Sequence, residues 1–358
     1  MLFLGGKIMM TLCRELSDTL VAILLVLILA AGGCSVQTSA LGSGEIAVKQ
    51  LGDRLRVEID GELFTEYLFC VKNRPILYPV IGPYGIGMTR NFPMKKNVPG
   101  EQQDHPWHTS LWYGHWPVNG INFFTLPPDA GRIEHGEVLE IHGGSRQGRA
   151  KVNSRWIDPQ GNIVLTDTRT LTFQIFGRDR VIDWEITLHA SNGEVTIGDA
   201  DRGTMAIRTH PNLRLANNPK EGVTTANGRA LNSEGLTAGA AAGANGGPVW
   251  GKRARWIDYW GQIDDKTVGI AILDHPANPR HPTHWMARGY GYIGACPFGL
   301  NSFEGKPLGT GDMKIPAGQS VTFRYRFIFH EGSPTEADIE GQWRRYAAMS
   351  KPSTKSGS

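Results

Sequence analysis

Histidine, arginine, aspartate and tryptophan gather in three segments that lack a helical or strand period. The segments cover residues 82–124, 199–214 and 274–299. From them we single out the side chains of Arg90, Asp104, His105, Trp107, His108, Asn119, His210, His275, His281, Trp285 and Arg288. Imidazoles and carboxylates exchange protons near neutral pH. Tryptophan faces stack on sugar rings, while arginine, aspartate and asparagine bond hydroxyls.

This mixture predicts a carbohydrate site, and each residue type suggests a role. We expect an acid or base among the histidines His105, His108 and His275. Arg90 and Arg288 would hold an anionic or hydroxyl-rich group. Trp107 and Trp285 would stack on the ligand. The remaining residues would bind substrate, and they are Asp104, Asn119, His210 and His281.

Two other functions fit the same residues. Imidazoles are common metal ligands, so the histidines could instead hold copper, zinc or iron. A non-catalytic binding module of the cell envelope is the third hypothesis. No G-x-S-x-G elbow and no P-loop occur, which argues against a serine nucleophile and a nucleotide cofactor, so the cofactor stays unassigned. The net charge of +3 is scattered rather than striped, which excludes a nucleic-acid partner.

The elements that must position these residues read as strands. Val57 and Ile59 alternate with polar residues, and Asp60-Gly61 is a hairpin signal. Strands recur every roughly 8–15 residues with turns between them, which predicts a single antiparallel β-sandwich domain over residues 46–350. A short C-terminal helix is expected over Thr335–Met349, with Ser333 as its N-cap. The Gly- and Ala-rich stretch Asn217–Pro248 is expected to be a surface loop.

The N-terminus looks like a targeting segment. Leu20–Ala31 is an apolar run too short for the ~20 residues of a membrane-spanning helix, as in a signal peptide over residues 1–33. Small residues precede Cys34, as in a bacterial lipoprotein, so Cys34 would carry lipid. Residues 34–45 would form a tether, and 351–358 a disordered tail. We expect a periplasmic, membrane-anchored protein, with soluble export or an uncleaved anchor as alternatives.

Two cysteines, Cys70 and Cys296, lie within the expected domain. They could form one disulfide in an oxidising compartment or remain two free thiols.

Several motifs resemble the PmoA-like family, which is often labelled methane oxygenase. They are Tyr78-Pro79-Val80 with Gly82-Pro83, Met88-Thr89-Arg90, Asp104-His105-Pro106-Trp107-His108, Asn119-Gly120, Asp274-His275-Pro276 through Pro282, and Tyr325-Arg326. Thr109-Ser110 stand where that family usually has arginine. The activity of the family is not established, so the resemblance supplies no mechanism. A membrane oxygenase subunit would need several apolar spans, so we do not infer methane oxidation. The strand-rich layout is similar to the galactose-mutarotase-like supersandwich.

Overall fold

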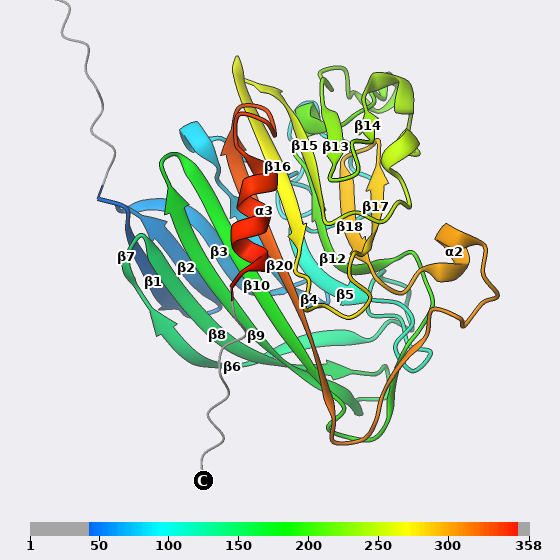
Figure 1. The fold of residues 1–358 in the computed structure, drawn as a ribbon. Helices are drawn as coiled ribbons and strands as arrows, with labels where there is room; N and C mark the ends of the chain where they lie inside the picture. The colour runs from blue at the N-terminus through cyan, green and yellow to red at the C-terminus, as the bar shows by residue number, and fades with distance from the viewer. Residues whose placement is uncertain (1–42, 350–358) are drawn as a thin grey trace, which may run out of the picture. The chain divides into compact units, whose positions relative to one another are not determined.

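The computed structural model describes residues 43–349. The expected signal peptide, the lipid site at Cys34, most of the tether and the C-terminal tail lie outside these residues. Within them the chain folds into two large antiparallel sheets and a small strand pair, with short helices at their margins (Figure 1). The expected all-β antiparallel sandwich with a short C-terminal helix is confirmed.

The first sheet has nine strands in the described region. Their spatial order is β17 (His284–Arg288), β18 (Tyr292–Cys296), β12 (Gly203–Arg208), β5 (Leu111–His115), β4 (Arg74–Val80), β3 (Glu62–Val71), β2 (Arg54–Ile59), β1 (Glu45–Leu51) and β7 (Gly144–Ser145). The Asp60-Gly61 hairpin joins β2 to β3 as expected, and both of its residues have a positive φ.

The second sheet also has nine strands in this part of the chain. Their order is β14 (Thr237–Ala238), β13 (Arg229–Asn232), β15 (Trp256–Ile263), β16 (Lys266–Asp274), β20 (Ser320–Glu331), β10 (Asp179–His189), β9 (Ile163–Phe176), β8 (Gln147–Ile157) and β6 (Arg132–His142). The strands β11 (Val195–Ile197) and β19 (Met313–Ile315) pair separately.

Within residues 43–349, buried apolar side chains form three clusters because strands alternate their faces. The main cluster combines buried residues of both large sheets, such as Tyr113 of β5 and Trp184 of β10. A second cluster, around Trp112 and Tyr292, covers the outer face of the first sheet. A third lies where the helix α3 (Ile339–Ala347) crosses the outer face of the second sheet (Figure 1). Each sheet is therefore covered on both faces over part of its area.

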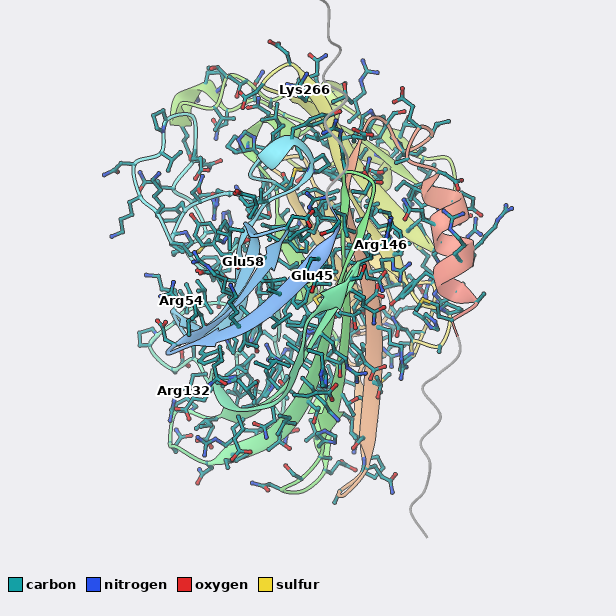
Figure 2. All side chains as sticks on the ribbon, turned by 90° about the vertical axis from the view of Figure 1, so that its left-hand side faces the viewer. Glu45, Arg54, Glu58, Arg132, Arg146 and Lys266 are labelled. Carbon is teal, nitrogen blue, oxygen red and sulfur yellow. The ribbon has the colours of Figure 1, made fainter. Side chains whose placement is uncertain are left out.

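The edge of the first sheet around β1 and β2 is polar. Lys49 pairs with Glu58, and Arg54 and Arg56 both pair with Glu66. Figure 2 shows this side of the molecule, with Arg54 and Glu58 labelled. Strand pairing and solvent-exposed ion pairs account for the charged side chains of this region.

Two expectations about elements need correction. The C-terminal helix begins at Ile339, not Thr335, because Asp338 has a left-handed φ of 50° and is the N-cap, accepting from the Gly341 amide. Ser333 and Glu336 instead bond each other in the preceding turn. The stretch Asn217–Pro248 is not only loop, because it contains β13 and β14, which extend the second sheet.

Cys70 and Cys296 are unpaired thiols, Cys70 exposed and Cys296 buried, which decides between the two alternatives. No helix within residues 43–349 is long and apolar enough to cross a bilayer.

A fully buried arginine–aspartate pair lies between strand residues of the second sheet. Arg169 bonds both carboxylate oxygens of Asp167, at 2.9 and 3.0 Å, and both side chains have no exposed surface. Trp156 donates to the same carboxylate at 2.7 Å. Removing one member would leave an uncompensated charge in the core.

We therefore expect Asp167→Ala to lower the free energy of unfolding by about 3–5 kcal/mol. The double variant Asp167→Leu/Arg169→Met should recover most of that loss, because it removes both charges. Urea unfolding measures both. Asp53→Ala, at the exposed partner of Arg54, is the matched control and should leave the midpoint nearly unchanged. An equal loss in the single and double variants would contradict this account.

Candidate functional site

A cleft of about 610 Å³ opens over the outer face of β5, β12, β18 and β17, within the range of small-molecule sites. All three polar segments contribute to it. Its lining consists of His105, Trp107, His108, Phe124, Thr125, Leu126, Pro127, Asp201, Arg202, Met286, Arg288, Tyr290 and Tyr292. The segments therefore converge, as the single-site hypothesis requires.

A row of outward-facing residues runs across the sheet beneath the cleft. The side chains in the middle of this row are small. Trp112 of β5 pairs with Ala206 of β12, and Ala206 pairs with Gly294 of β18. A Cβ at position 294 would lie 2.6 Å from the Tyr292 hydroxyl. Glycine there lets the Tyr292 ring lie close to the sheet, which leaves space above it.

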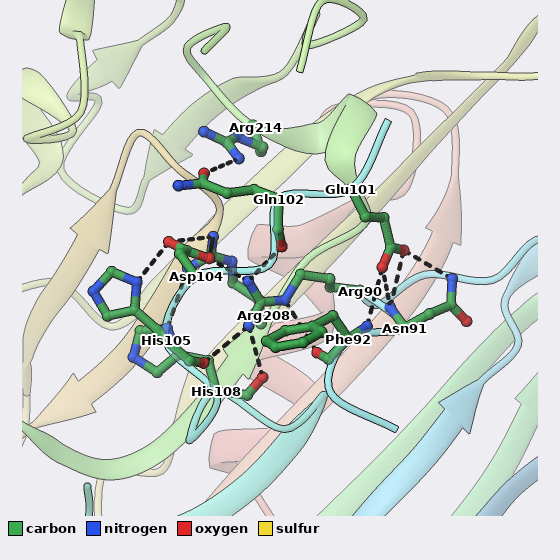
Figure 3. A network of polar contacts seen from close by, with 10 residues as sticks. All are labelled: Arg90, Asn91, Phe92, Glu101, Gln102, Asp104, His105, His108, Arg208 and Arg214. Carbon is green, nitrogen blue, oxygen red and sulfur yellow. Dashed lines mark hydrogen bonds and ion pairs between the residues drawn. The ribbon is translucent and has the colours of Figure 1, made fainter. Parts of the chain in front are cut away.

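Below one wall of the cleft, Asp104 lies between two buried arginines (Figure 3). Arg208 donates to both carboxylate oxygens, at 2.9 and 3.2 Å, and Arg90 donates to Oδ1. Arg90 also donates to four backbone carbonyls of residues 92–108. One guanidinium therefore fixes both the carboxylate and the loop that carries it.

The charge states follow from this arrangement. Burial alone would raise the pKa of Asp104, but the hydrogen bond from His105 and the charges of Arg208 and Arg90 outweigh it and hold that pKa well below its usual range. Burial, and then the like charge of Arg208, lowers the pKa of Arg90 to about 9. Both arginines and the carboxylate are thus charged at neutral pH.

His105 presents a free ring nitrogen. Its Nδ1 lies 2.5 Å from Asp104 Oδ2, so Nδ1 carries the proton that the carboxylate accepts, and in the neutral ring Nε2 is then the acceptor. The side chain is 38% exposed and lines the cleft. Its φ of 44° is in the left-handed region, which costs about 1–3 kcal/mol for a non-glycine residue. Such strain persists where the surroundings impose it, here the bonds to Asp104 and Arg90.

His108 has a different protonation state. Arg208 Nη1 lies 3.1 Å from His108 Nδ1, so Nδ1 accepts and Nε2 bears the hydrogen. Burial, and then the neighbouring charge of Arg208, holds the pKa of His108 well below its usual value. His108 is therefore a neutral hydrogen-bond donor, not a base.

Aromatic rings form the wall above these groups. The His105 and His108 rings stack at 4.7 Å, and Tyr290 stacks on His105 at 5.5 Å. The Arg208 guanidinium lies 4.6 Å from the Tyr290 ring centre. Trp107 meets His105 edge to face at 5.3 Å. The cleft thus combines flat apolar faces with fixed donors and one free imidazole nitrogen.

Six of the residues expected from the sequence meet at this place. His105, Trp107, His108 and Arg288 line the cleft. Arg90 and Asp104 lie behind it. Arg90 donates to the backbone carbonyls of His105 and His108, and Asp104 accepts from the His105 ring, so Arg90 orients the site rather than binding substrate.

Three other expected residues lie elsewhere in the fold. Trp285 is fully buried and donates to the Ala254 carbonyl, so it cannot stack on a ligand. Asn119 forms an exposed turn that pairs with Thr196. His210 accepts from the Asn212 amide as the N-cap of a short 3-10 helix.

The second Asp-His-Pro motif has a structural role. Asp274 accepts from Asn278, from His281 at 2.7 Å and from the Thr283 amide. His275 packs against Tyr346 of α3, on the outer face of the second sheet. His275 and His281 therefore lie beside α3 and not at the cleft, so the structure does not bring them together with His105 and His108 as the single-site hypothesis expects.

Sequence reasoning did not select Tyr290, Tyr292 or Arg208. Gly289-Tyr290-Gly291-Tyr292-Ile293-Gly294 has G-x-G-x-x-G spacing, which could have drawn attention to the tyrosines. It forms the antiparallel turn from β17 to β18, not a strand-to-helix turn, so it does not make a dinucleotide site.

No group of three or more histidine, cysteine or carboxylate side chains within residues 43–349 is arranged to hold a metal ion. Asp104 is paired with two arginines, so its carboxylate is not available to bind a metal ion together with His105 and His108.

The model of a family of unknown function, DUF6807, matches residues 54–344. No curated protein matches the sequence. Among solved structures, the α-galactosidase AgaA of Geobacillus stearothermophilus is 11% identical with a TM-score of 0.38, over 80% of this chain and 41% of that one. The α-galactosidase of Lactobacillus brevis is 10% identical with a TM-score of 0.38, over 86% and 43%.

A galactose mutarotase-like protein of Lactobacillus casei is 8% identical with a TM-score of 0.30, over 80% of this chain and 100% of that one. The chain thus spans 41% and 43% of the two α-galactosidases. Likenesses of this degree carry no argument about the site.

The protonation states of the cleft histidines can be tested by nuclear magnetic resonance. We expect the His108 ring to be neutral with its hydrogen on Nε2 at pH 6, in ¹H–¹⁵N spectra of the imidazoles. Arg208→Met should raise the pKa of His108, because it removes a nearby positive charge. His142 on β6, distant in sequence and exposed, is the control resonance and should be unchanged. A His108 pKa that does not move would contradict the role given to Arg208.

Proposed function

We propose a function from the cleft itself, because the chain belongs to DUF6807, a family of unknown function. The cleft binds a carbohydrate, and His105 exchanges a proton with it. The single observation that carries this proposal is the free Nε2 of an imidazole that a carboxylate orients, set beside aromatic faces.

The binding part follows from the chemistry of sugars. One face of a pyranose ring is largely C–H and packs on aromatic side chains, for which Trp107 and Tyr290 are available. The hydroxyls need donors and acceptors at fixed positions. His108 Nε2–H is a donor and Asp201 an acceptor on the cleft surface. Stacking and hydrogen bonding together would orient the ring.

The catalytic part follows from the Asp104–His105 pair. Asp104 holds the His105 ring in the tautomer whose Nε2 accepts a proton, and it stabilises the imidazolium that forms. The proton comes from a ligand hydroxyl or carbon and returns to the ligand in a later step. Arg90 and Arg208 keep Asp104 ionised and fixed, so they are positioning residues.

The test is binding and turnover on a panel of mono- and oligosaccharides. We expect Trp107→Ala to weaken binding at least tenfold, because it removes a stacking face. His105→Gln should keep most of the affinity and lose turnover by about 10²–10⁴-fold, the usual contribution of general acid–base catalysis. His142→Gln, at an exposed histidine of β6, is the matched control and should change neither.

Binding without turnover by the unaltered protein would instead favour the non-catalytic module. Absence of binding to every sugar would overturn the proposed function. The metal hypothesis would be revived by a stoichiometric metal in protein purified without added metal.

We also propose, from the sequence alone, that the protein is exported and lipid-anchored through Cys34. Its support is the apolar run Leu20–Ala31 followed by small residues before the cysteine. The resemblance to the PmoA-like family stays a prediction as well.

Cys34→Ala should therefore release the protein from the membrane fraction of a bacterial expression host. Mass spectrometry of the unaltered protein should show a lipid-modified N-terminal Cys34. Cys70→Ala is the control and should leave the protein in the membrane fraction. An unmodified cysteine, or membrane retention of Cys34→Ala, would contradict the anchor.

A further inference from the structure

We propose that the sugar bound in the cleft is acidic, and that Arg288 binds its carboxylate. This inference rests on the proposed function and names the class of its substrate. It derives from the surroundings of Arg288, from the charge balance of the cleft and from the segment that holds Arg288 in place.

Arg288 has neutral partners. Its Nη1 donates to Asn245 Oδ1 at 3.2 Å, and its guanidinium lies 5.2 Å from the Trp250 ring centre. No carboxylate within residues 43–349 forms an ion pair with it, and its Nε is buried without a hydrogen-bond partner there. Many other arginines of the described region pair with a carboxylate, as Arg253 does with Glu304. An oriented guanidinium that lacks a counterion and lines a cleft is a site for an anion.

The whole cleft has an excess of positive charge. Arg202 and Arg288 line it, against the single carboxylate of Asp201. Arg202 reaches Asp201 only at 4.0 Å and lies over the Trp116 ring. Behind the wall, Asp104 is shared by two arginines, Arg90 and Arg208. Because these groups are partly shielded from water, an anion entering the cleft gains more than it would at an open surface.

The segment that carries Asn245 is built to reach Arg288. It belongs to the Gly- and Ala-rich stretch Asn217–Pro248, to which the proposed catalysis assigns no role. Its backbone touches that of β17 so closely that a Cβ at Gly289 would lie 1.7 Å from the Gly243 oxygen. A Cβ at Gly246, where φ is 83°, would lie 1.8 Å from the Ala287 oxygen. The Gly289 amide donates to Ala244 at 3.0 Å.

This close approach brings Asn245 to the guanidinium and fixes the orientation of Arg288. Asn245 and Trp250 are therefore positioning residues. Neutral groups hold the arginine without cancelling its charge. The planar fork of arginine matches the two oxygens of a carboxylate, so a uronate is the ligand that the geometry points to. A sulfate ester shares the anionic oxygen chemistry and is separated from it below.

The experiment is isothermal titration calorimetry on the whole protein with matched ligands. Galacturonate and glucuronate, as monomers and short oligomers, are compared with galactose and glucose of the same length, and with sugar sulfates. We expect uronates to bind at least tenfold more tightly than their neutral partners at low salt. The ratio should fall as salt rises, because exposed charges are screened.

Arg288→Met should abolish the uronate preference, so that a uronate binds no more tightly to this variant than its neutral partner does. Arg288→Lys, which keeps the charge and loses the fork, should retain part of the preference. Asn245→Ala should lower it severalfold. Arg146→Met, at an exposed arginine beside the opposite edge strand β7 of the same sheet (Figure 2), is the matched control and should behave as the unaltered protein. Thermal melting confirms that each variant is folded.

The outcomes separate this inference from the function on which it rests. Neutral sugars that bind as tightly as uronates, or a uronate preference that survives Arg288→Met, would overturn the acidic substrate and leave carbohydrate binding intact. Sulfates that bind more tightly than uronates would overturn the carboxylate. If no sugar of either kind binds, the proposed function and this inference both fail.

Discussion

The candidate site depends on the hydrogen bonds and ion pairs that surround the Asp104 carboxylate. The carboxylate joins a guanidinium from the loop before β5 to one from β12, and it orients His105. Two buried guanidinium groups beside each other repel, so neither could stay buried without it. Because Arg90 also binds four carbonyls of residues 92–108, an irregular loop acquires a fixed conformation. The geometry of the cleft histidines is a consequence of this buried ionic centre.

The same centre explains why two neighbouring histidines differ. Asp104 accepts from His105 Nδ1, while Arg208 donates to His108 Nδ1. An imidazole next to a carboxylate exposes a basic nitrogen, and one next to a guanidinium exposes a donor. The stack of the two rings therefore offers a ligand one acceptor and one donor at close range. Such complementary groups suit a polyhydroxylated ligand, which presents both kinds of partner.

The outer faces of the two large sheets are covered differently, and this difference leaves space for the site. On the second sheet α3 covers apolar residues around Ile328. On the first sheet loops cover the corresponding face. The small residues Ala206 and Gly294 leave space above the centre of that face. The long Gly-rich stretch extends the second sheet and then reaches across to Arg288. Elements from both sheets thus end at one cleft.

Local pattern determined much of this protein. Alternating apolar residues and turn signals identified the antiparallel all-β class, the Asp60-Gly61 hairpin and a C-terminal helix, because these depend on neighbours in the chain. Composition also identified the three segments, and Asp104 to His108 proved central. Only the tertiary structure decided which of them act together. Asp104-His105-Pro106 and Asp274-His275-Pro276 are the same tripeptide, yet one lies at the cleft and the other beneath α3. The difference comes from partners distant in sequence: Arg208 lies 104 residues from Asp104 and completes the ionic centre. Asp274 bonds its own loop instead. Strand order decides which remote residues come together, and no local sequence pattern predicts the strand order.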